Sequence, residues 1–178
     1  MKKRVLCLIA EGFEEIETVT PVDLLRRAGV EVVIASLNGG TVTGRCGIRL
    51  EADSSLAEVN SGACDLLLIP GGPGVNVLRV DGRAAALAQA FAAEGKMIAA
   101  ICAAPLILND AGLLEGRRFT AHFSTRGDLP NLLSERVVID GKLITSRGAG
   151  TALDLGFALV EYLAGPAAAE NVRQAIMA

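Results

Sequence analysis

The feature that most constrains this chain is a series of short, nearly continuous apolar runs that alternate with longer, helix-like stretches. Runs of strand length lie at Val5–Ile9, Glu31–Ala35, Leu66–Ile69 and Met97–Ile101. Strands of this kind are typical of a parallel sheet that is covered on both faces. We therefore predict one α/β domain, in which ligands bind beyond the carboxyl ends of the strands.

The rest of the pattern predicts the covering helices and a hairpin. The predicted helices are Glu14–Ala28, Gly82–Ala93, Pro105–Ala111, Thr151–Leu163 and Ala167–Ile176. Short strands are expected at Phe119–Ala121, Val137–Ile139 and Leu143–Thr145, with Asp140-Gly141 as the hairpin turn between the last two.

Single residues indicate how the first of these helices bends and ends, and which face of another is apolar. Pro21 either kinks the first helix or starts a second piece at Thr20, because Thr20 and Asp23 fit a capping box. Gly29 follows two arginines and is expected to end that helix. In the helix that begins at Thr151, an apolar stripe is formed by Leu153, Gly156, Phe157 and Val160.

Composition narrows the classes of function. The chain has 178 residues, which suits a single domain over residues 1–178, and 51% of them are apolar, which argues against disorder. The net charge is -3 and aromatic residues make up only 3%, so nucleic-acid binding is not expected. The opening run Val5–Ala10 is too short for a signal peptide, and no run approaches the roughly 20 apolar residues of a membrane span. We expect a soluble cytoplasmic protein with no membrane partner.

The use of cysteine and histidine argues against disulfides and metals. The chain contains no C-x-x-C pair, so free thiols are expected at its four cysteines, Cys7, Cys46, Cys64 and Cys102. His122 is the only histidine, whereas zinc sites usually need several His or Cys ligands at close spacing. We therefore predict no protein-bound metal and no cofactor.

Cys102 lies where a predicted strand ends and a predicted helix begins. In K-M-I-A-A-I-C-A-A-P, Pro105 suits the first turn of that helix, and small residues on both sides of the cysteine allow a sharp turn. The backbone N–H groups of Cys102 and Ala103 are then expected to be free to face an anion, as at a nucleophile elbow. The alternative is a small buried hydrophobe, since free cysteine is among the most buried residue types.

Energetics decide what a reactive Cys102 needs. Lowering a thiol pKa from about 8.5 to near 5 requires roughly 5 kcal/mol. A helix terminus contributes about 0.3–1 kcal/mol, and a charge-assisted hydrogen bond about 1.5–3 kcal/mol. The helix terminus alone is therefore insufficient, and the thiolate needs at least one hydrogen-bond donor.

Two further segments, each of which follows a predicted strand, offer groups that could donate a hydrogen bond to the thiolate or to an oxyanion. Glu14, Glu15 and Glu17 open the first helix, where they either complement its dipole or turn one desolvated, protonated carboxyl inward. The sequence L-L-L-I-P-G-G-P-G predicts a tight turn at Gly71 and Gly72 with close backbone approach. Gly72 could present an N–H to an oxyanion, or the loop could bind nothing. The pattern is not a nucleotide-binding motif.

The last two candidates follow later strands. His122, in T-A-H-F, is either a structural residue or a general acid or base near Cys102. Arg147, in T-S-R-G-A-G-T, either binds a carboxylate or lies on the surface.

Taken together, these motifs resemble the ThiJ/PfpI superfamily, and within it the parkinsonism-associated protein deglycase branch. The resemblance rests on E-G-F-E-E-I-E-T-V-T-P-V-D-L-L-R-R-A-G-V, L-L-L-I-P-G-G, I-A-A-I-C-A-A-P and L-I-T-S-R-G-A-G-T, in one colinear order over nearly the whole chain. It implies a flavodoxin-like three-layer sandwich with a mainly parallel sheet and a nucleophile elbow, and usually a homodimer.

The resemblance also implies roles for individual residues. Cys102 is implied to be the nucleophile, Glu17 the protonated donor to its thiolate, and His122 the active-site histidine. Gly72 and Ala103 are implied to offer oxyanion N–H groups, beside Gly71 in the substrate-binding turn.

The chain departs from the family pattern at three places. Protease-like members carry histidine directly after the cysteine, where this chain has Ala103, so peptidase activity is not expected. Ala149 replaces the proline of S-R-G-P-G-T, and Gly44-Arg45-Cys46 stands where some relatives have C-S-R. No role is assigned to Arg45 or Cys46.

Two classes of function remain open at this point. The first is a cofactor-independent glyoxalase (a lyase) or protein deglycase (a hydrolase), which acts through Cys102 on methylglyoxal-type 2-oxoaldehydes or their protein adducts. The second is a non-catalytic redox sensor or chaperone of oxidative stress, whose exposed thiolate oxidises to sulfinate. The expected partners are small reactive aldehydes or glycated protein side chains, and a second copy of the chain.

Overall fold

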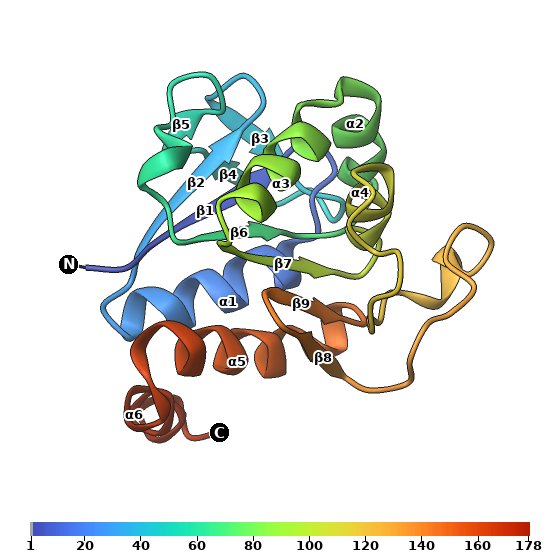
Figure 1. Cartoon of the computed structure of the whole chain (residues 1–178). Helices are drawn as coiled ribbons and strands as arrows, with labels where there is room; N and C mark the ends of the chain where they lie inside the picture. The colour runs from blue at the N-terminus through green and yellow to red at the C-terminus, as the bar shows by residue number, and fades with distance from the viewer. Residues whose placement is uncertain (1) are drawn as a thin grey trace.

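The computed structural model describes residues 2–178, which form helices around a seven-stranded sheet (Figure 1). The strand order is β5-β2-β1-β6-β7-β9-β8, and all neighbours are parallel except β8 and β9. The strands are β1 (Arg4–Ile9), β2 (Glu31–Ser36), β5 (Ser54–Ser55), β6 (Leu66–Ile69), β7 (Met97–Ile101), β8 (Val137–Asp140) and β9 (Leu143–Ser146). A separate antiparallel pair joins β3 (Thr41–Thr43) and β4 (Arg49–Glu51).

Helices cover both faces of the large sheet, which confirms the predicted three-layer flavodoxin-like sandwich (Figure 1). One face packs against α1 (Glu15–Arg27) and α5 (Ala152–Ala164), and α6 (Pro166–Ile176) packs against α5 on the side away from the sheet (Figure 1). The other packs against α2 (Gly74–Asp81), α3 (Arg83–Ala93) and α4 (Pro105–Asp110). Because side chains alternate along a strand, Val5 and Cys7 join the first core, whereas Leu6 and Leu8 join the second. The continuous apolar runs follow from this double burial.

Several predicted elements are confirmed. The four buried strands and the β8–β9 hairpin around Asp140-Gly141 are present. Helix α1 continues through Pro21, so no second helix starts at Thr20. Within residues 2–178, none of the helices combines the length and the apolar character that crossing a membrane requires.

Other predictions are wrong for identifiable reasons. Residues 119–121 form no strand, because β9 already lies between β7 and β8, and the Thr120 N–H instead donates to Thr145 Oγ1 at 2.9 Å. Helix α2 was not expected, and Gly82, with φ of 82°, separates it from α3. Leu153 is 41% exposed, whereas the other members of its predicted stripe are buried.

Gly156 lets α5 approach α1 closely. A Cβ at this position would lie 2.5 Å from Leu24 Cδ1 and 3.2 Å from Pro21 Cα. Since α1 carries the three acids at its N-terminus, this contact helps to fix where those carboxyl groups lie over the sheet.

Candidate active site

Cys102 occupies a sharp backbone turn directly after β7. Its φ is 65°, a left-handed conformation that costs a non-glycine residue roughly 1–2 kcal/mol. Its N–H donates to the Ser146 carbonyl at 2.9 Å, and its own carbonyl accepts the His122 N–H at 2.8 Å. The prediction that the Cys102 N–H is free to face an anion is therefore wrong, because β9 uses it to extend the sheet.

Two other backbone N–H groups face the cysteine sulfur. They belong to Gly72 and Ala103, and both favour the ionised form of Cys102. Gly72 has φ of 90°, and a Cβ there would lie 2.6 Å from Gly12 O and 2.7 Å from Glu14 N. Only glycine therefore allows this turn to approach the site. The N–H groups of Gly72 and Ala103, which the family resemblance implied, both face Cys102 Sγ.

The three acids at the start of α1 have separate environments. The Glu14 carboxylate caps the helix by accepting the Glu17 N–H at 2.8 Å. Glu15 Oε1 accepts N–H groups from Cys46 at 2.8 Å and Ile48 at 3.3 Å, so it anchors the turn between β3 and β4. Only Glu17, which is fully buried, points toward Cys102.

Glu17 is fixed by the turn after β6. Its Oε2 accepts the Gly71 N–H at 2.8 Å, while the buried Oε1 has no N–H or O–H partner and faces the Cys102 thiol. A Cβ on Gly71 would lie 2.6 Å from both Cys102 Cβ and Glu17 Oε2. The absence of a side chain at Gly71 thus makes the approach of the carboxyl to the cysteine possible.

Burial shifts both titrating groups of this pair. It raises the pKa of Glu17 to about 7, although hydrogen bonds from Cys102 and the Gly71 N–H oppose the rise. It also raises the pKa of Cys102 to about 12, and the negative charge of an ionised Glu17 adds to that rise. The low thiol pKa of a reactive cysteine therefore requires the proton to reside on Glu17, since protonation removes the opposing charge and supplies a donor.

His122 forms a cluster with Cys102 and Glu17 around Gly148. The ring is half-buried, and Nδ1 lies 2.8 Å from Ser124 Oγ. A Cβ on Gly148 would lie 3.5 Å from His122 Cδ2, 3.8 Å from Glu17 Oε1 and 3.9 Å from Cys102 Sγ. The three predicted catalytic side chains therefore surround one point. The sequence analysis did not single out Gly148, although its place in S-R-G-A-G-T at a strand end was a usable signal.

The remaining candidates lie at the edge of this cluster. Arg45 is exposed, and its charge slightly favours ionised Glu17. Cys46 is exposed and reaches Glu15 through its backbone rather than the site. Arg147 is exposed and lines a cavity of about 500 Å³ that opens beside His122 and Gly148.

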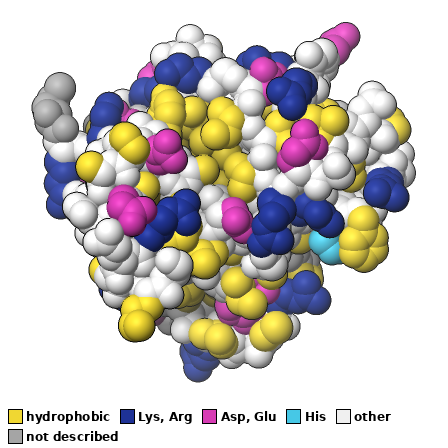
Figure 2. Space-filling view, turned by 90° about the horizontal axis from the view of Figure 1, so that it is seen from below, with side chains coloured by type: hydrophobic (Ala, Val, Ile, Leu, Met, Phe, Trp, Pro, Cys, Tyr) yellow, Lys and Arg dark blue, Asp and Glu magenta, His cyan; other side chains and the backbone are white. Residues whose placement is uncertain are grey.

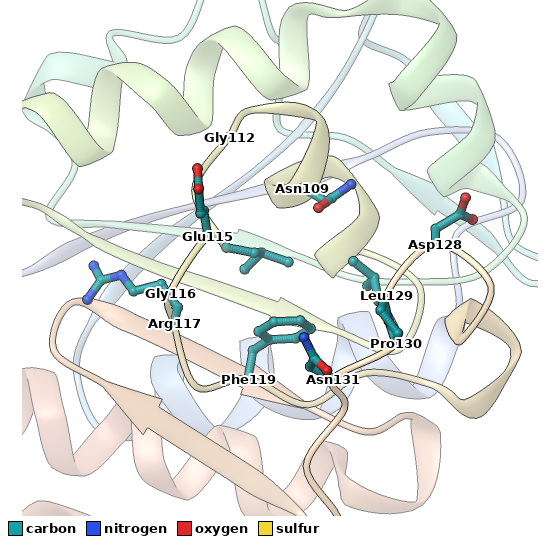
Figure 3. A pocket seen from close by; sticks show the side chains of 11 residues that line it. Asn109, Gly112, Glu115, Gly116, Arg117, Phe119, Asp128, Leu129, Pro130 and Asn131 are labelled. Carbon is teal, nitrogen blue, oxygen red and sulfur yellow. The ribbon is translucent and has the colours of Figure 1, made fainter.

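A second cavity of about 480 Å³ lies apart from these residues (Figure 3). Its lining includes Asn109, Arg117, Phe119 and Asp128, and contains none of the candidate catalytic side chains. Of the three candidate catalytic side chains, His122 lines the cavity beside Gly148.

Comparison with known proteins gives a consistent result. Residues 3–162 match the family model described as the DJ-1/PfpI family. The chain is 38% identical over 184 residues to Protein dj-1beta of Drosophila melanogaster, covering 99% of this chain and 98% of that protein. It is 36% identical to Deglycase TK1284 of Thermococcus kodakarensis, covering 83% of this chain and 91% of that protein.

Solved structures agree with the sequence comparison. The crystal structure of Drosophila melanogaster DJ-1beta superposes with a TM-score of 0.95 at 37% identity, covering 99% of this chain and 98% of that one. The structure named "Toxoplasma gondii DJ-1, oxidized" gives a TM-score of 0.92 at 33% identity, covering 98% of both chains.

Proposed function

Because the chain belongs to the DJ-1/PfpI family, we propose that it is a deglycase-type enzyme that acts through Cys102 on methylglyoxal-type 2-oxoaldehydes or their protein adducts. The observation that carries this proposal is the convergence of Cys102 Sγ, Glu17 Oε1 and the His122 ring within 4 Å of one point beside Gly148. A nucleophile, a buried acid and a second proton carrier are the groups that such chemistry needs. The reaction requires neither a cofactor nor glutathione.

The first step forms a hemithioacetal. With the proton of the pair already on Glu17, the Cys102 thiolate attacks the aldehyde carbon as the carbonyl π electrons move to oxygen. The N–H groups of Gly72 and Ala103 stabilise the negative charge before and during the attack. The aldehyde oxygen then takes the proton from Glu17.

The second step moves a proton between adjacent carbons. Glu17 or His122 removes the proton from the former aldehyde carbon and returns one to the neighbouring carbonyl carbon, while the hydroxyl proton of the hemithioacetal passes to the neighbouring carbonyl oxygen. The product is a thioester of a 2-hydroxy acid. Water cleaves the thioester, releases the acid and restores the thiol. Where the substrate is a protein adduct, the amine leaves first. A carboxyl with a pKa of about 7 suits this exchange, because both protonation states are populated near neutral pH.

Conversion of methylglyoxal to lactate tests the proposal directly. Turnover is measured for the wild type, Cys102→Ser and Glu17→Gln, with Cys46→Ser as a matched control because Cys46 is an exposed thiol outside the cluster. We expect the two site variants to lose at least about 100-fold in turnover and the control to keep it. Equal rates in all four proteins would overturn the mechanism.

The same geometry also supports a redox-sensing role. Cys102 is only 9% exposed, so the expectation of an exposed thiolate is wrong. A sulfinate there would still accept hydrogen bonds from the Gly72 and Ala103 N–H groups and from protonated Glu17. Mild hydrogen peroxide followed by intact-mass and peptide analysis tests this role. A two-oxygen adduct confined to Cys102 supports it, whereas oxidation of Cys46 alone argues against a reactive Cys102.

A homodimer belongs to this proposal. Ile16 and Val19 on α1 are 53% and 47% exposed, and Ile48 in the turn beyond β3 is 58% exposed. The segments that carry Ile16 and Ile48 are linked, because the Ile48 N–H donates at 3.3 Å to Oε1 of Glu15, the residue before Ile16. Sedimentation of the wild type and Ile16→Glu tests the pairing, and a monomeric wild type would contradict it.

A further inference from the structure

The cavity of about 500 Å³ beside His122 and Gly148 adjoins the candidate active site. Its walls are the segment around residues 121–136 and the turn at residues 147–151. Gly148 and His122 both line the cavity, and a Cβ on Gly148 would lie 3.9 Å from Cys102 Sγ, so the sulfur lies behind Gly148 at the inner end of the cavity. A substrate attached at the sulfur therefore has room to extend into this space.

The charges on the cavity wall have one sign. The lining includes Arg126, Arg136 and Arg147, and it contains no Asp or Glu. We call this cavity, defined by those three residues, the arginine cleft. Figure 2 shows the histidine at the surface with basic side chains close to it.

The three arginines differ in whether a carboxylate pairs with their guanidinium group. Arg136 pairs with Asp154 at 2.7 Å and donates to the Gly150 carbonyl at 2.7 Å. Arg147 donates to the Ser134 carbonyl at 3.2 Å, and among residues 2–178 neither it nor Arg126 forms an ion pair with a carboxylate. Two guanidinium groups thus keep uncompensated charge at the cleft.

The cavity of Figure 3 provides the contrast. Arg117 shares its lining with Glu115 and Asp128, so charges of both signs are present there. The arginine cleft lacks that compensation, although both cavities have similar volumes.

From these observations we propose that the arginine cleft is an anion subsite, and that the enzyme prefers 2-oxoaldehydes or adducts that carry a carboxylate or phosphate group. The inference rests on the proposed function, because the reacting aldehyde is placed at Cys102. Guanidinium groups present parallel N–H donors that match the oxygens of carboxylate and phosphate. The reactive end of the substrate lies at the sulfur, and its charged end lies between Arg126 and Arg147.

A matched substrate pair tests the subsite. 4,5-Dioxopentanoate and its methyl ester carry the same reacting carbonyl groups and differ in one charge. We expect kcat/KM to favour the acid, and the ratio of the two values to fall roughly threefold to tenfold in Arg126→Gln and in Arg147→Gln. Arg27→Gln removes the same charge at the far end of α1, where Arg27 pairs with Asp23, and should leave the ratio unchanged. Competition by inorganic phosphate and by acetate at equal ionic strength separates the two anion classes.

Alkylation of Cys102 separates failure of the subsite from failure of the proposed function. Iodoacetate and iodoacetamide react with the same sulfur without turnover, and the ratio of their rates should also fall in the two arginine variants. If the wild type turns over neither 2-oxoaldehyde, the proposed function fails, while the alkylation ratio still reports on the cleft. Ratios that are the same in the wild type and in both arginine variants overturn the subsite.

Discussion

The Gly71 N–H donates to Oε2 of Glu17 at 2.8 Å, although 54 positions separate the two residues in the chain. This bond turns the carboxyl so that its other oxygen faces Cys102. The candidate site therefore depends on a contact between the first turn of α1 and the turn after β6, and its three side chains come from separate segments: Glu17 from α1, Cys102 from the turn after β7, and His122 from the loop that follows α4.

Gly71→Ala should disable the site without changing a single titratable group. The new Cβ would lie 2.6 Å from Cys102 Cβ and from Glu17 Oε2, so the carboxyl or the cysteine must move. A misplacement of about 1 Å can cost about 100-fold in rate, and we expect a loss of that order in kcat/KM for methylglyoxal. Gly127→Ala is the control, because a Cβ at Gly127 has no neighbour within 4 Å. Wild-type activity in Gly71→Ala would contradict the close packing.

The proton of the Glu17–Cys102 pair should reside on the carboxyl near neutral pH. The N–H groups of Gly72 and Ala103 favour sulfur ionisation, and although an ionised Glu17 raises the pKa of Cys102, a protonated Glu17 carries no opposing charge and has an O–H to donate to the thiolate. The carboxylate form of Glu17 has only the Gly71 N–H and the weak Cys102 thiol as hydrogen-bond donors. We expect thiolate absorbance near 240 nm at about pH 7.5 that is lost in Cys102→Ser and kept in Cys46→Ser. If the wild type shows no such band, the carboxylate holds the charge and Glu17 acts first as a base.

The sequence was informative where burial or chemistry leaves a continuous pattern. The four central strands are apolar because both faces of the sheet are covered, so β6 and β7 could be predicted residue by residue. The short β3 and β4 and helix α2 were missed, since three-residue strands and an eight-residue helix give too few periods to recognise.

The site was harder to predict, because its assignments depend on tertiary contacts. Nothing local distinguishes Glu14, Glu15 and Glu17, and their roles follow from which one caps, which one anchors a loop and which one meets Gly71. The Cys102 N–H was expected to be free, but β9 lies beside β7 and Ser146 accepts it.

The left-handed backbone at Cys102 should reverse the usual preference of alanine over glycine. At φ of 65°, any Cβ is strained, so Cys102→Gly relieves a cost that Cys102→Ala retains. We expect the glycine variant to be more stable than the alanine variant by about 1 kcal/mol, measured by urea denaturation. The matched pair at Ala90, in the middle of α3, should show alanine as the more stable residue. If alanine is more stable than glycine at position 102 as well as at position 90, the turn at Cys102 is unstrained.

Glu17 should make stability depend on pH once the cysteine is removed. Burial raises its pKa in the folded protein to about 7, from an ordinary value of 4.5, and loss of the thiol donor removes one of the groups that oppose this rise. The folded state therefore binds the proton more tightly than the unfolded state, so the stabilisation is fully present below about pH 4.5 and declines as pH rises through about 7.

The measurement is urea denaturation of Cys102→Ala and of Cys102→Ala/Glu17→Gln between pH 4.5 and pH 8. The difference between the two unfolding free energies cancels the contributions of the other titrating groups, which both variants share. We expect the difference in unfolding free energy to change by roughly 3 kcal/mol in favour of the double variant at the higher pH. Curves that run parallel across this range would place Glu17 in a solvated environment and remove it as the proton donor to Cys102.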